Sequence, residues 1–121
     1  MKERHREIIA FIHENGARTK LHICGDITHL LSSLRDVGTD ILDLDYGVDI
    51  AYARFIMGEN MILMGNIEPV LIQNVSPEEV ERLSRELVAK YGDERFILSA
   101  GCEITVGTPH ENLMAMQKAS K

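Results

Sequence analysis

Met61-Ile62-Leu63-Met64 is a continuous apolar run, and Gly65-Asn66-Ile67-Glu68-Pro69 follows it directly. An uninterrupted apolar run of this length, bounded by turn residues, is typical of a strand that is buried on both faces, as in a parallel sheet. The sequence therefore predicts a buried strand over residues 61–64 and a loop over residues 65–69.

Three further short segments predict strands, at residues 19–24, 41–45 and 95–99. Amphipathic segments predict helices at residues 2–14, from Asp26 or Thr28 to Gly38, at 48–57, at 76–92, and from Thr108 onward. The clearest helix start is Ser76-Pro77-Glu78-Glu79, with serine at the cap, proline at the first position and glutamate three residues after the serine. Strands that alternate with helices predict an α/β fold with a parallel sheet of right-handed β-α-β units.

The composition indicates one globular domain over residues 1–121. The 121 residues are 45% hydrophobic and 26% charged, with a formal net charge of −6. This charge disfavours nucleic-acid binding, and no stretch has the roughly 18 uncharged apolar residues that a membrane span needs. The first residues lack the apolar core of a secretory signal, so we expect a cytoplasmic protein in which the two cysteines stay reduced.

The chemistry-bearing motif is His22-Ile23-Cys24, at the end of the first predicted strand. Cys102, the only other cysteine, follows the fourth predicted strand. In an extended strand His22 and Cys24 point to the same side, so both could reach one ion. One histidine and two cysteines suit a zinc ion with one open position, although spacing alone leaves equally open that these are buried thiols and a core histidine.

Position in the fold favours the metal site. In parallel α/β folds functional groups gather outside the carboxyl ends of the strands. His22, Cys24 and Cys102 follow such ends, as do Asp45 and Asn66. We therefore predict that these side chains share one rim of the sheet.

With these residues in hand, the chain resembles the C-terminal half of the uroporphyrinogen decarboxylase superfamily, and most closely its cobamide-dependent methyltransferase branch, the methylcobamide:coenzyme M methyltransferase type. The order and spacing of five segments together carry this resemblance. They are Leu21-His22-Ile23-Cys24-Gly25-Asp26, Val37-Gly38-Thr39-Asp40-Ile41, Leu44-Asp45, Met64-Gly65-Asn66-Ile67-Glu68-Pro69 and Ser99-Ala100-Gly101-Cys102-Glu103.

The resemblance implies a zinc ion held by His22, Cys24 and Cys102, with Asp45 and Glu103 as further candidate ligands. It implies transfer of a methyl group from a corrinoid, carried by a partner protein, to a thiol such as coenzyme M. Asp45 and Asn66 are the expected substrate-positioning residues.

The resemblance implies a TIM (β/α)8 barrel, and the length restricts this expectation to half a barrel with four strands, because a complete barrel takes about 250 residues. Such a half barrel leaves sheet edges and an apolar inner face exposed, so we expect a homo-oligomer, such as a dimer, or pairing with a complementary half-barrel chain. Two alternatives to the methyltransferase remain. One is a truncated half barrel without activity; the other is a uroporphyrinogen decarboxylase-like enzyme, disfavoured because the arginines lie mostly away from the predicted rim.

Overall fold

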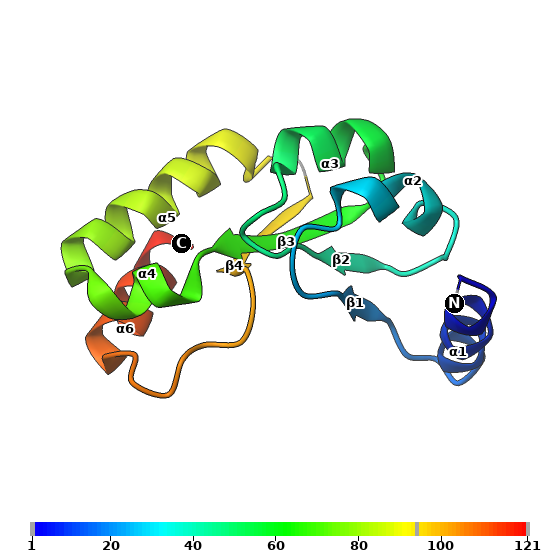
Figure 1. Cartoon of the computed structure of the whole chain (residues 1–121), viewed down its shortest axis with the longest axis horizontal. Coiled ribbons are helices and arrows are strands. Elements are labelled where there is room, and N and C mark those ends of the chain that lie inside the picture. The colour runs from blue at the N-terminus through cyan, green and yellow to red at the C-terminus, as the bar shows by residue number, and fades with distance from the viewer. Residues whose placement is uncertain (1, 94, 121) are drawn as a thin grey trace.

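The computed structural model describes residues 2–93 and 95–120, and in it four parallel strands form one sheet (Figure 1). The strands are β1 (Lys20–His22), β2 (Ile41–Asp43), β3 (Ile62–Ile67) and β4 (Phe96–Ala100), in the order β1-β2-β3-β4. Neighbours in the sheet are therefore also neighbours in the sequence, as expected of consecutive β-α-β units.

Helices precede, connect and follow the strands. They are α1 (Lys2–Glu14), the 3-10 turn η1 (Thr28–Leu30), α2 (Leu31–Leu34), α3 (Ile50–Met57), α4 (Pro69–Asn74), α5 (Pro77–Tyr91) and α6 (His110–Ala119). The predicted start of α5 is confirmed, since the Ser76 side chain accepts a hydrogen bond from the backbone N–H of Glu79.

The segment 65–69 differs from its prediction. β3 continues through the expected loop to Ile67, and the short helix α4 begins at Pro69. The strand continues because Asn66 and Ile67 pair in register with Ser99 and Ala100 of β4. A prediction from one strand alone contains no information about such pairing.

Three other boundaries were also wrong. β1 ends at His22, so Cys24 lies in the following loop and not in the strand. The helix expected up to Gly38 consists of η1 and the single turn α2, which ends at Leu34. The last helix, α6, begins at His110 and not at Thr108: Pro109 occupies the cap position, and the Thr108 hydroxyl bonds that of Thr105.

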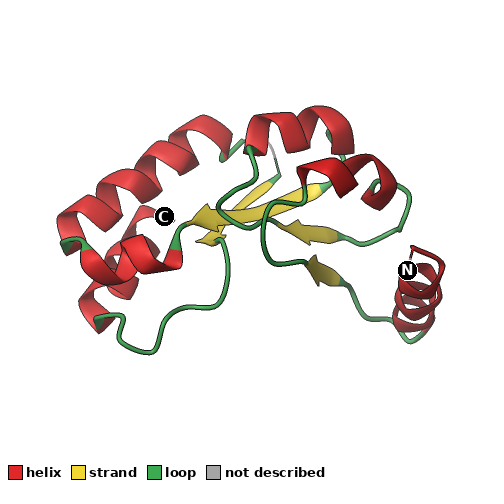
Figure 2. Cartoon of the chain, viewed as in Figure 1, coloured by secondary structure: helices red, strands yellow, loops and turns green. Residues whose placement is uncertain are grey.

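One face of the sheet is covered by helices and the other is not. Leu42 and Leu63, in register with each other, are fully buried in a core with residues of α2 and α3. Side chains alternate along strands, so His22, Asp43 and Met64, which share a register, belong to the opposite face. Figure 2 shows the helices above the sheet and beyond its two ends, and the loop between β4 and α6 passing along its lower side.

The uncovered face is partly apolar. Ile41, Ile62 and Met64 are only half-buried, and Ile97, in register with Met64, is 40% exposed. In the described residues, 2–93 and 95–120, no helix has the length and apolar character that crossing a membrane requires.

Candidate metal centre

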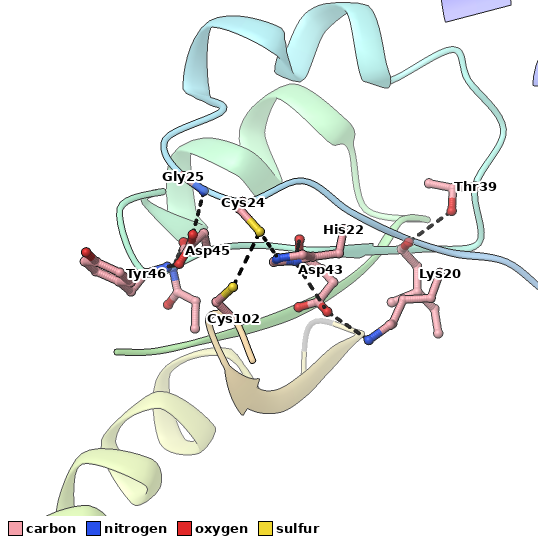
Figure 3. Close-up of polar contacts among 11 residues, drawn as sticks. Lys20, His22, Cys24, Gly25, Thr39, Asp43, Asp45, Tyr46 and Cys102 are labelled. Carbon is pink, nitrogen blue, oxygen red and sulfur yellow. Dashed lines mark hydrogen bonds and ion pairs between the residues drawn. The ribbon is translucent and has the colours of Figure 1, made fainter. Parts of the chain in front are cut away.

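His22, Cys24 and Cys102 come together beyond the carboxyl ends of β1 and β4 (Figure 3). The Sγ atom of Cys24 lies 3.3 Å from Nε2 of His22 and 3.5 Å from Sγ of Cys102. All three donor atoms lie within 4.8 Å of one another. Cys24 is exposed and Cys102 half-buried, so an ion and a further ligand can approach from solvent.

Two of the three spacings between these donor atoms match those around a zinc ion, and the third, between His22 and Cys102, lies within 4.8 Å. Two sulfur atoms at about 2.3 Å from a tetrahedral zinc lie about 3.8 Å apart, and a sulfur and a histidine nitrogen lie about 3.6 Å apart. The distances of 3.5 Å and 3.3 Å are each within about 0.3 Å of these tetrahedral edges. Three protein donors leave the fourth corner free for a substrate or water.

A hydrogen bond at Nδ1 of His22 orients the imidazole ring so that Nε2 can bind a metal ion. Its Nδ1 atom lies 3.2 Å from the backbone carbonyl oxygen of Asp43. A carbonyl only accepts, so Nδ1 carries the proton and the lone pair of a neutral ring is on Nε2, the atom that faces Cys24. A histidine ligand whose other nitrogen donates to a carbonyl is the usual arrangement in protein metal sites.

Behind His22 lies a buried carboxylate. The Asp43 side chain is 9% exposed, and its Oδ2 atom forms an ion pair with Nζ of Lys20 at 2.9 Å and lies 3.6 Å from Nδ1 of His22. Its Oδ1 atom is buried and has no hydrogen-bond partner among the residues that the structure describes. This carboxylate places negative charge close to the ring, which favours a strongly donating imidazole.

Asp45 holds the loop that carries Cys24. Its Oδ2 atom accepts a hydrogen bond from the backbone N–H of Gly25 at 2.5 Å, and Oδ1 accepts one from that of Tyr46 at 2.7 Å. The pKa of the Cys24 thiol is raised, chiefly because it hydrogen-bonds Cys102 and would face a second thiolate, with a smaller contribution from the charge of Asp45. A divalent cation would offset this repulsion.

Asn66 supports the neighbouring loop. Its side-chain N–H₂ group donates to the carbonyl oxygens of Asp45 and Val48, at 3.1 Å and 2.7 Å. Asn66 also lines a cleft of about 670 Å³ between the β2–α3 loop and α5, together with Tyr46 and Leu87. Thus Asn66 is accessible from a cleft, whereas Asp45 is 5% exposed.

The structure brings all five predicted site residues to one rim. Three of them form the cluster: His22, Cys24 and Cys102. The other two, Asp45 and Asn66, form hydrogen bonds to the backbone of the neighbouring loops. Within residues 2–93 and 95–120, neither Asp45 nor Glu103 belongs to the metal-ligand cluster.

Two residues beside the cluster were not predicted from the sequence: Lys20, and Asp43 in its position behind His22. The alternation Lys20-Leu21-His22 was a usable signal, because residues two apart on a strand share a face. That Asp43 of β2 is the partner of these side chains could not be predicted, because it depends on the strand register that places His22 beside Asp43.

The fold and the site together define a class of protein. It is a barrel-type α/β protein whose parallel sheet carries a candidate metal centre, the solvent-accessible histidine–cysteine cluster, at the carboxyl ends of its strands. Among known protein families, the model of the uroporphyrinogen decarboxylase (URO-D) family matches residues 1–121 of this chain. The chain therefore belongs to the uroporphyrinogen decarboxylase family.

The similar proteins include enzymes of two kinds. A methylcobamide:CoM methyltransferase of Methanosarcina mazei is 36% identical over 118 residues, covering 96% of this chain and 33% of the relative. A methylated-thiol–coenzyme M methyltransferase of the same organism is 35% identical over 102 residues, covering 84% and 27%. A uroporphyrinogen decarboxylase of Drosophila virilis is 34% identical over 92 residues, covering 76% and 24%.

Among solved structures, a methyltransferase from Methanosarcina mazei matches 99% of this chain with a TM-score of 0.85 at 25% identity. The match covers 34% of that protein. The predicted fold class, parallel βα units forming part of a TIM-type barrel, is thereby confirmed. The chain spans about a third or less of the length of the relatives it matches.

Proposed function

We propose that this chain carries the zinc site of a methyltransferase that passes a methyl group from a corrinoid to a small thiol such as coenzyme M. The observation that carries the proposal is the spacing of the His22, Cys24 and Cys102 donor atoms, which suits a tetrahedral ion with one open position. The names of the methyltransferase relatives support the choice of reaction.

Each residue has a definite task in this proposal. His22, Cys24 and Cys102 hold the ion, which when bound acts as a Lewis acid and lowers the pKa of a substrate thiol at the open corner. The carbonyl of Asp43 keeps the Nδ1 proton on His22 and so leaves Nε2 free to bind. Asp45, through Gly25, keeps the Cys24 loop in place.

The methyl donor and acceptor approach from the open side of the site. The exposed Cys24 lies on that side, so a corrinoid carried by a separate protein is a suitable donor. Asn66, at the cleft beside the β2–α3 loop, is the proposed substrate-positioning residue, and Asp45 supports the backbone that Asn66 contacts.

Metal analysis tests the proposal most directly. Protein purified without chelator should contain about one zinc per chain, and His22→Ala, Cys24→Ser and Cys102→Ser should each lose most of it, because three protein ligands are already the minimum for such a site. His29→Ala is the matched control, since His29 is exposed and outside the cluster. Wild-type protein that binds no zinc would contradict the proposal.

The second candidate is an assembly module in which residues 1–121 form the C-terminal half of a barrel without catalysis of their own. The half-exposed residues Ile41, Ile62, Met64 and Ile97 on the uncovered sheet face favour it, because such a face is normally covered inside a barrel. A second copy or a complementary half-barrel chain would cover this face.

Solution mass and zinc content on the same sample separate the two candidates. A zinc-loaded protein that transfers methyl groups from a methylcorrinoid to a thiol supports the first. An oligomer that binds zinc but transfers no methyl group, even with a complementary half barrel added, supports the second.

A further inference from the structure

The Cys24 and Cys102 side chains face each other directly, with their sulfur atoms 3.5 Å apart (Figure 3). A disulfide bond is about 2.05 Å long, so the two sulfurs need to approach by only about 1.5 Å. Both cysteines lie in loops beyond the strands. Cys24 immediately precedes Gly25, and Cys102 immediately follows Gly101. Because both cysteines lie outside the strands, small movements of these loops and side chains would supply this approach.

The two thiols also differ in access. Cys24 is exposed and Cys102 is half-buried, and both are free thiols. In exchange reactions the more accessible thiolate attacks the small disulfide first, and a neighbouring thiolate then resolves the mixed disulfide. The pair therefore has the arrangement of an attacking and a resolving cysteine.

We propose that Cys24 and Cys102 form a redox-modification site, at which a low-molecular-weight disulfide converts them into one intramolecular disulfide. The Cys24 thiolate attacks the small disulfide, forms a mixed disulfide and releases one small thiolate. The Cys102 thiolate then attacks the sulfur of Cys24, forms the protein disulfide and releases the second small thiolate. In total the protein loses two protons and two electrons, and one small disulfide becomes two small thiols.

Oxidation at this site competes with metal binding. The disulfide removes both sulfur donors from the His22 set, and a bound metal ion would in turn block both thiolates. This link rests on the proposed function, whereas formation of the disulfide in metal-free protein does not. The bond would also join the carboxyl ends of β1 and β4, the two edge strands of the sheet.

The experiment exposes metal-free protein to oxidised glutathione at about pH 8.5, close to the ordinary pKa of a cysteine thiol, and counts free thiols after denaturation by mass spectrometry. We expect the count to fall from two to none without a retained glutathione adduct, and a cross-linked peptide pair containing residues 24 and 102. A stable glutathione adduct on Cys24 of the wild-type protein, or a disulfide only between two chains, would overturn the inference.

Two variants and a metal arm complete the design. Cys102→Ser should retain glutathione on Cys24, because the resolving thiol is missing, and Cys24→Ser should react at least tenfold more slowly. Zinc added beforehand should slow oxidation of the wild type at least tenfold. Unslowed disulfide formation in zinc would sink the zinc proposal and leave the redox site, whereas zinc binding without a disulfide in the metal-free protein would do the reverse.

Discussion

Gly101 packs directly against the backbone of Tyr46, so close that a Cβ atom at residue 101 would overlap the Tyr46 nitrogen. This contact joins the loop after β4 to the loop after β2. It fixes the chain immediately before Cys102, and Asp45, immediately before Tyr46, fixes the Cys24 loop. The two cysteines are thus brought together through one shared backbone segment.

Gly101→Ala should therefore disturb both stability and metal binding. The added methyl group meets backbone, which cannot move aside, so we expect a loss of about 1–3 kcal/mol in the free energy of unfolding and weaker zinc binding. Urea unfolding and competition with a chelator measure the two effects. Gly107→Ala is the control, because its Cβ meets the flexible end of Gln73; equal effects in both variants would contradict the contact.

Asp45→Ala should destabilise the protein by about 2–4 kcal/mol, because it removes the acceptor of two backbone N–H groups. The Cys24 loop, held through Gly25, should then bind zinc less tightly. Asp26→Ala, which among the described residues removes the hydrogen bonds to Thr28, should have a smaller effect on both the stability and the zinc affinity. Unchanged zinc affinity in Asp45→Ala would show that this carboxylate does not position Cys24.

Asn66→Ala should lower the free energy of unfolding by about 1–3 kcal/mol, because the carbonyl oxygens of Asp45 and Val48 lose the hydrogen bonds that Asn66 donates. If Asn66 also positions substrate, KM for the thiol should rise in the complete enzyme while zinc content stays constant. Asn74→Ala is a matched control, since Asn74 is exposed and bonds only the carbonyl of Val70 in its own helix. A KM equal to that of the wild type would restrict Asn66 to a structural role.

Acid should weaken the fold through Asp40. Hydrogen bonds from the Thr19 N–H and from His13 lower the pKa of this carboxyl from 3.8 to about 2. The folded pKa is the lower one, so the contribution to stability is present above about pH 4 and is lost as the pH falls toward 2. After allowance for solvent screening we expect about 1 kcal/mol.

Urea unfolding of Asp40→Asn and wild type between pH 7 and about pH 2 measures this contribution. The difference between the two proteins should be largest near neutral pH and should shrink steeply toward the acid end, because Asp40 becomes protonated there. Asp36→Asn, at an exposed ion pair with Lys2, should show little difference at any pH. A gap that stays constant down to the acid end would exclude the ionisation of Asp40 as its cause.

The strands and helices were predictable where the pattern was local. The capping sequence at Ser76 and the apolar run before Gly65 indicate structure by themselves, because caps and periodicity act within a few residues. The ends of β1 and β3 were not predictable, since strand length depends on pairing with a neighbour. The ion pair of Lys20 with Asp43 was not predictable either, because it also depends on how β1 pairs with β2.

The sequence by itself determined the order of βα units and the three donor side chains, because hydrophobic periodicity and ligand chemistry belong to single residues and their near neighbours. Only the tertiary structure decided that the donors meet. β1 and β4 are the two edges of the sheet, and in a flat sheet they would lie about 14 Å apart, at about 4.8 Å per strand. Curvature of the sheet and the braced loops at Asp45 and Gly101 reduce the distance between the cysteine sulfurs to 3.5 Å.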